Sequence, residues 1–147
     1  ISYEKLLIAT GARAIMPDLP GVISPGVMAL KNLEDGRRLK TYIRDRTVKK
    51  AVILGMGYIA FEMCEAFRAR GIEVEMIKPR PVFIPWMNEQ LAWMVKKELE
   101  ANQVKVHFGQ PIEASCSFIQ GMKTGRGLTI STSMPLALKA SHISKAM

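Results

Sequence analysis

The chain has 147 residues, 48% of them hydrophobic and 23% charged, which fits one domain with a buried core and excludes a disordered or fibrous chain. Its longest nearly continuous apolar run, Ala51 to Phe61, is too short to span a membrane, and no signal peptide is visible at the N-terminus. The chain has a net charge of +8, and before position 114 its basic residues are interspersed with acidic ones. We therefore expect a solvated surface rather than a nucleic-acid partner.

The N-terminal third of the chain predicts a strand, a connector and a helix. Leu6 to Ala9 form a short apolar run, and a proline- and glycine-rich stretch follows from Arg13 to Gly26. Asn32 followed by Asp35 resembles a helix N-cap with an acid in the first turn, which predicts a helix to about Arg46.

The segment from Lys49 to Lys78 predicts a βαβ unit. Ala51 to Leu54 are continuously apolar, as a parallel strand buried on both faces requires. After a glycine turn, apolar residues recur with helical spacing at Ile59, Met63 and Phe67. Gly71 should end this helix, and Ile72 to Ile77 should form the next strand, with Val74 and Met76 on one face.

The rest of the chain predicts one more helix and two further strand-like stretches. Asn88 can cap a helix through about Ala101, and we expect it to present four side chains to a core: Leu91, Met94, Val95 and Leu99. Val104 to Phe108 predict a strand, and after Glu113 only LTIST alternates like one. These elements predict a Rossmann-like three-layer α/β sandwich around a mostly parallel sheet, with an antiparallel excursion in the tail.

The glycine turn carries the most specific signal for a ligand. Gly55, Gly57 and Ala60 satisfy the pattern G-x-G-x-x-G/A between a predicted strand and a predicted helix. The first glycine permits a sharp turn, the second lets the backbone approach a pyrophosphate, and the alanine permits close packing of helix and sheet. The helix amides and dipole would hold the phosphates. The predicted loop comprises Gly55, Met56, Gly57, Tyr58, Ile59 and Ala60. The alternative is a turn that merely connects strand to helix.

The ribose end of this site lacks its usual acid. An NAD-preferring site places Asp or Glu at the end of the second strand, but Lys78 stands there, and Glu75 lies inside the strand. Lys78 and Arg80 could neutralise a 2′-phosphate, which favours NADPH over NADH; the alternative is a solvated loop.

Three segments together resemble a known family: KLLIATGARAIMPDLPG, GMGYIAFEMCEAFRARGIEVEMI and KKELEAN before VKVHF. They resemble the FAD-dependent pyridine nucleotide-disulfide oxidoreductases, and within these the coenzyme A-disulfide reductase and NADH oxidase branch. The resemblance extends to about Glu113. It implies NAD(P)H as the cofactor here, FAD in a complete parent enzyme, and a homodimer as one assembly. It also divides the chain into an exit from the FAD domain (1–30), an NAD(P)-binding Rossmann module (31–113) and an atypical basic, Ser-rich tail (114–147).

The resemblance implies roles for Tyr58 and for three further positions. The backbone at Thr10 and Gly11 would approach the flavin nucleotide, Tyr58 would cover the nicotinamide pocket, and Glu62 would orient the carboxamide. The alternatives are an ordinary aromatic on the first helical turn for Tyr58 and a surface carboxylate for Glu62.

The departures from the family bear on activity. The first FAD-binding unit, its redox-active cysteine and the dimerisation domain are not in this sequence, and the loss of acids after Glu113 suggests a truncated or frame-shifted product. We therefore expect a module that seats the nicotinamide for hydride transfer to FAD and is inactive alone. The alternative is a nucleotide-binding fold without redox activity that serves as an interaction or regulatory domain. The absence of an acid at Lys78 and the ATG segment, Ala9 to Gly11, argue against an S-adenosylmethionine methyltransferase.

The cysteines and histidines indicate no further chemistry. Cys64 and Cys116 form neither a CxxC pair nor a zinc-binding spacing, so we expect no metal site and a reducing, cytoplasmic location. Cys64 falls in an apolar helical pattern and should pack in the core. His107 is expected to be a packed or edge histidine, without an acid/base partner set.

Overall fold

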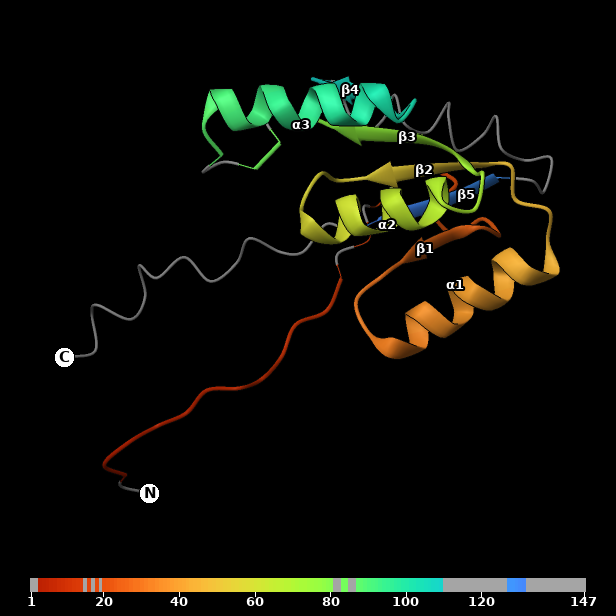
Figure 1. The fold of residues 1–147 in the computed structure, drawn as a ribbon. Coiled ribbons are helices and arrows are strands. Elements are labelled where there is room, and N and C mark those ends of the chain that lie inside the picture. The colour runs from red at the N-terminus through yellow and green to blue at the C-terminus, as the bar shows by residue number, and fades with distance from the viewer. Residues whose placement is uncertain are drawn as a thin grey trace.

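A five-stranded parallel sheet with the order β1-β5-β2-β3-β4 organises the chain in a computed structural model (Figure 1). The structure describes residues 3–14, 16, 18, 20–80, 83–84, 87–109 and 127–131. The strands are β1 (Val27–Ala29), β2 (Lys50–Leu54), β3 (Glu73–Lys78), β4 (Lys105–Phe108) and β5 (Gly127–Ser131). The helices are α1 (Leu33–Asp45), α2 (Tyr58–Arg68) and α3 (Glu89–Ala101).

The predicted βαβ unit is present as β2, α2 and β3. Residues 51 to 54 are buried on both faces of the sheet, as predicted, because β2 lies between β5 and β3. Gly71 ends the helical segment at a φ of 72°: its amide donates to the carbonyl of Arg68 at 2.9 Å, and the amide of Ile72 donates to that of Phe67 at 3.1 Å. This pair of bonds is a Schellman motif, which confirms the predicted stop.

The predicted cap of α1 is also confirmed. The amide of Asp35 donates to Asn32 Oδ1 at 2.9 Å, and the amide of Asn32 donates to Asp35 Oδ2 at 3.1 Å. These reciprocal bonds satisfy two amides at the helix start, so the local sequence fixes where α1 begins.

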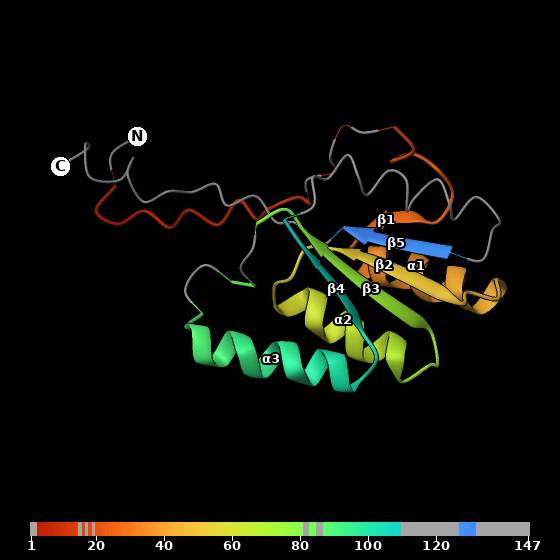
Figure 2. The ribbon, with the colours of Figure 1, turned by 90° about the horizontal axis from the view of Figure 1, so that it is seen from above.

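The core forms where the helices meet one face of the sheet. Leu39 of α1, Phe67 of α2 and Leu99 of α3 belong to one buried cluster, together with Ile53 and Met76 of the sheet. Figure 2 shows α2 and α3 side by side against the strands. A smaller cluster on the opposite face comprises Val52, Leu54 and Ile77. The antiparallel excursion that we expected in the tail is not seen in residues 127–131, which form the parallel strand β5; the other residues of the tail lie outside the described part of the chain.

The core-facing side of α3 differs from our expectation. Leu99 is buried and Val95 half-buried, as predicted, but Leu91 is 43% exposed and Met94 55% exposed. The helix packs through Ala92, Val95 and Leu99, which share a face at i, i+3 and i+7. The prediction for Leu91 and Met94 was wrong because the small Ala92 sets the face that meets the sheet, while the larger residues form an adjacent stripe.

The strand expected at Leu6 to Ala9 is not formed. Residues 5–14 carry no regular secondary structure, and Leu7 is 88% exposed. No described strand pairs with this segment, which extends beyond the carboxyl-terminal ends of the strands (Figures 1 and 2). An apolar run forms a strand only where another strand completes its hydrogen bonds. The neighbouring β1, by contrast, follows the connector and was not predicted.

The sheet reaches beyond the range 31–113. The edge strand β1 precedes this range, and β5, which contains most of the LTIST stretch, follows it and pairs in parallel with both β1 and β2. The assignment of residues 1–30 as an exit from an FAD domain stays a prediction, and so does the tail assignment for the undescribed residues on either side of β5.

Candidate functional site

The glycine loop between β2 and α2 forms the turn that its sequence predicts. Gly55 has a φ of 116°, a conformation that residues with a side chain rarely adopt. Its amide donates to the carbonyl of Ile77 at 2.9 Å, so the loop is fastened to the end of β3. The turn therefore opens at the carboxyl edge of two adjacent parallel strands, where α/β proteins bind nucleotides.

The space beside Gly57 is open. A Cβ placed on this residue would meet no heavy atom within 4 Å, and its φ of −100° suits any residue. The protein's own packing therefore does not require glycine at this position. Close approach by a bound pyrophosphate would require it, and the open space fits that group.

The start of α2 differs from the starts of the other two helices that the structure describes. The Asn32 and Asn88 side chains cap α1 and α3, whereas α2 begins at Gly57 without a side-chain cap and without an acid in its first turn. No side chain of its own thus competes for the amides and positive dipole end that face this loop. These groups suit an anion such as a pyrophosphate.

The side chains of the predicted loop divide between core and surface. Met56 and Ala60 are buried in the core, so Met56 can offer a ligand only its backbone and Ala60 permits close packing against the sheet. Ile59 is half-buried. Tyr58 is 64% exposed, and Glu62, one helical turn later, is also exposed. Both side chains are thus placed on the accessible surface of α2.

The structure places Lys78 near the loop but does not bring Thr10 and Gly11 to it. Lys78 follows Ile77, the residue that accepts the Gly55 amide, and is half-buried; Arg80 is exposed. Thr10 and Gly11 lie exposed in the extended N-terminal segment. A contact of these two residues with a nucleotide would therefore form away from the described sheet.

Glu75 is turned away from the ribose position, as the sequence indicated. Its carboxylate is buried and accepts from Lys50 Nζ at 2.6 Å, while its other oxygen lies 3.1 Å from His107 Nε2. Burial alone would raise the pKa of Glu75, but the hydrogen bonds and charges of Lys50 and His107 outweigh it and lower the pKa. His107 lies on the edge strand β4, as expected, and serves this pair.

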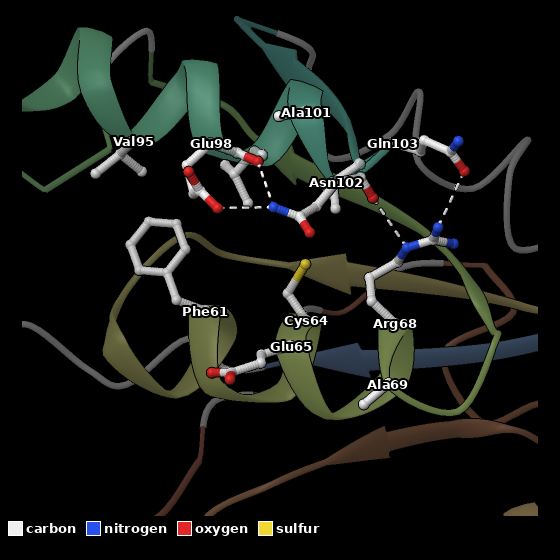
Figure 3. A pocket seen from close by; sticks show the side chains of 12 residues that line it. Phe61, Cys64, Glu65, Arg68, Ala69, Val95, Glu98, Ala101, Asn102 and Gln103 are labelled. Atoms are coloured by element: carbon white, nitrogen blue, oxygen red, sulfur yellow. Dashed lines mark hydrogen bonds between the residues drawn. The ribbon is translucent and has the colours of Figure 1, made fainter.

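A cavity of about 830 Å³ lies between α2 and α3 (Figure 3), and none of the loop residues 55–60 lines it. Phe61, Cys64 and Val95 provide apolar lining, and Arg68 spans one end by donating to the Asn102 carbonyl at 3.0 Å. The sequence did not predict this cavity, because it arises from how two helices separate on the sheet. Cys64 is buried, as predicted, and burial raises the pKa of its thiol to about 11.

The described part of the chain contains neither a metal-ligand cluster nor a membrane-spanning helix. No group of three or more His, Cys, Asp and Glu side chains there could hold a metal ion. None of the helices described above is long and apolar enough to cross a membrane. Cys116 lies outside the described residues.

Comparison with known proteins identified a family model. The model for pyridine nucleotide-disulphide oxidoreductases matches residues 1–135. Our expectation that the resemblance ends near Glu113 is therefore wrong. The match includes β5, which contains most of the strand-like LTIST stretch and pairs with the central strand β2, although acidic residues are absent after Glu113.

Relatives and solved structures agree with this match. The NADH oxidase of Methanocaldococcus jannaschii is 32% identical over 114 residues, 77% of this chain and 25% of that protein. Reduced CoADR-RHD of Bacillus anthracis has the same fold, with a TM-score of 0.73 at 23% identity over 92% of this chain and 26% of its own. The matched part of the chain spans about a quarter of the length of these curated relatives.

The water-forming NADH oxidase of Lactobacillus brevis, solved with NADH, is a further structural neighbour. It is 25% identical, with a TM-score of 0.65 over 76% of this chain and 24% of its own. An engineered NADPH oxidase derived from it, solved with NADPH, gives the same values. Its five substitutions exchange one aspartate for alanine and introduce two arginines.

Proposed function

Because the chain belongs to the pyridine nucleotide-disulphide oxidoreductase family, we propose that it is the NAD(P)H-binding module of a flavin-dependent oxidoreductase. Its role is to seat the nicotinamide for hydride transfer to FAD in a complete enzyme. The relatives named as NADH oxidases are about three times as long as this chain, so hydride transfer to FAD is proposed for a longer parent and not for the chain alone.

The glycine loop is the observation that supports the proposal most directly. The turn at Gly55, the open space at Gly57 and the uncapped start of α2 all lie within residues 55–58. A pyrophosphate needs a close backbone approach and several amide donors, and these three features supply both. A turn that merely joined strand to helix would need only the first.

Tyr58 and Glu62 are the residues that we assign to the nicotinamide half of the cofactor. They lie on one exposed side of α2, four residues apart. The Glu62 carboxylate can accept from the carboxamide and so fix the orientation of the ring, while the Tyr58 ring covers the pocket before binding. The nicotinamide supplies the hydride, and the protein contributes positioning and electrostatics.

The FAD-binding half is proposed to lie in a longer parent, with Thr10 and Gly11 near the flavin nucleotide. The exposed N-terminal segment extends from the same edge of the sheet at which the glycine loop opens (Figure 2). We expect the chain alone to bind the reduced cofactor without oxidising it, because no flavin is available to accept the hydride.

Calorimetric titration of the 147-residue chain with NADPH, NADH, ADP-ribose and S-adenosylmethionine tests the proposal. We expect binding of the first three and no loss of reduced nicotinamide absorbance during incubation with oxygen. Indifference to all four ligands would overturn the proposal and favour an interaction or regulatory domain. Binding of S-adenosylmethionine alone would indicate a methyltransferase-like site.

A further inference from the structure

The end of β3 carries a second feature of the same site, two cations beside the glycine loop. The hydrogen bond from the Gly55 amide to the Ile77 carbonyl holds Lys78 next to the turn. Side chains alternate along a strand, so Lys78 lies on the same side of the sheet as Val74 and Met76, which pack in the core with α2. Its ammonium group is therefore placed on the side of the sheet from which α2 begins.

No carboxylate of β3 is available to a ribose at this edge. An NAD site uses an acid at the end of this strand to accept from the ribose 2′-hydroxyl. The two acids of β3, Glu73 and Glu75, lie in its first half and pair with Lys105 at 3.1 Å and Lys50 at 2.6 Å. Both carboxylates are thus occupied at the opposite end of the strand from Lys78.

The charges at this edge are not balanced within the described part of the chain. Among the described residues, neither Lys78 nor Arg80 forms a salt bridge with a carboxylate. The pKa of Lys78 is lowered, mainly by burial and to a smaller extent by repulsion from Arg80. An anion bound here would oppose both effects.

The engineered oxidase provides an independent parallel for this arrangement. In that NADPH-bound protein, the exchanged aspartate stands 18 residues after a glycine exchanged for alanine, and one introduced arginine directly follows it. In this chain Lys78 also stands 18 residues after Ala60, the alanine of the glycine pattern, and Arg80 lies two residues further on. Both sequences therefore place an alanine 18 residues before a position without an acid, with an arginine one or two residues beyond that position.

We propose that Lys78, together with Arg80, makes the site select NADPH over NADH by pairing with the 2′-phosphate. This inference rests on the proposed function, because it concerns the ribose end of the same dinucleotide seat. Lys78 is the main determinant because it is held beside the loop and is partly shielded from water. Arg80 adds charge from an exposed position.

Calorimetric titration of the full chain with NADPH and NADH, and with ADP-ribose with and without a 2′-phosphate, tests the inference. We expect the 2′-phosphorylated ligand of each pair to bind at least about tenfold more tightly, as a charge-assisted contact implies. Its affinity should also fall more steeply with added salt. Lys78→Ala should remove most of both differences, and Lys78→Arg should keep them.

Lys40→Ala is the matched control, because Lys40 is an exposed lysine on α1. It should leave both affinities unchanged, and circular dichroism of every variant shows that the fold is retained. Equal affinity of the natural chain for NADPH and NADH would overturn the inference while leaving the proposed function intact. A preference for NADPH that survives replacement of both Lys78 and Arg80 by alanine would overturn the assignment of these residues. Failure to bind any of the four ligands would instead reject the proposed function.

Discussion

At Gly57 the proposed ligand requires a glycine but the fold does not. Its backbone conformation suits an L-residue, and the position of a Cβ is empty. Gly55 differs, because its φ of 116° would strain any residue with a side chain. A substitution at Gly57 can therefore report on ligand binding without reporting on folding.

Gly57→Ala is expected to keep the fold and weaken dinucleotide binding by about tenfold or more, because a methyl group would occupy the pyrophosphate's approach. Urea denaturation measures the stability of the fold, and calorimetry with ADP-ribose measures the binding affinity. Gly36→Ala is the control: it also adds a methyl group into open space, but within α1. That control should stabilise the helix by about 0.5–1 kcal/mol and leave affinity unchanged. An unaltered affinity in Gly57→Ala would contradict the proposed pyrophosphate-binding site at the glycine loop.

The buried surroundings of Cys64 lower the reactivity of its thiol. The thiol is buried and its pKa is raised to about 11, so almost no thiolate forms at neutral pH. In a Cys116→Ser variant, we expect a thiol reagent at pH 8 to react slowly with the native chain and quickly after unfolding in urea. Equally rapid labelling in both states would show that Cys64 is accessible, contrary to its place in the core.

At the scale of elements, Glu75 joins three neighbouring strands. Its buried carboxylate on β3 contacts Lys50 of β2, and on β4 it contacts His107 and, at 3.5 Å, Lys105. Removing this acceptor leaves the three cationic or polar groups without their common partner. The arrangement therefore fastens the edge strand β4 to the centre of the sheet.

Glu75→Gln should lower the free energy of unfolding at pH 7 by roughly 1.5–3 kcal/mol, the range for hydrogen bonds to charged groups. Because the pKa of Glu75 is lowered in the folded chain, its contribution is present above the unfolded pKa and lost as the pH falls through the folded value. The difference in the free energy of unfolding between the natural chain and Glu75→Gln should thus shrink below about pH 4. Urea denaturation across this pH range measures it.

Glu73→Gln is the matched control for that experiment. The Glu73 side chain lies on the same strand and also pairs with Lys105, but it is 47% exposed. Exposed pairs contribute little, so we expect a change of at most about 1 kcal/mol. A larger effect at Glu73 than at Glu75 would show that burial does not determine the strength of this network.

At the scale of the whole molecule, β5 connects parts of the sheet that are distant in sequence. It lies between the early strand β1 and the central strand β2, and Leu128 on it is fully buried. Its pairing brings residues near both ends of the described chain into one sheet. The fold therefore depends on a strand that follows a long stretch without predicted elements.

Leu128→Ala is expected to lower the free energy of unfolding by about 2–5 kcal/mol, because it leaves a cavity in the core. Leu33→Ala, at a position on α1 that is 72% exposed, should change it by at most about 0.5 kcal/mol. Urea denaturation of both variants gives the comparison. Similar, small effects at the two positions would mean that β5 does not stabilise the sheet.

The sequence by itself determined the features that depend on near neighbours along the chain. The cap at Asn32, the turn at Gly55 and the stop at Gly71 each use a local backbone conformation or hydrogen bond, so a few residues suffice to predict them. The continuous apolar run of β2 predicted its central place for a similar reason, since only a strand buried on both faces needs it.

Only the tertiary structure decided which elements find partners. The apolar run at Leu6 to Ala9 forms no strand because no described strand completes its hydrogen bonds, whereas Val27–Ala29 forms one because β5 lies beside it. The exposed side of α3 and the network around Glu75 likewise depend on residues from other elements. Such contacts join residues far apart in the sequence, so their pairing is set by how the whole sheet assembles.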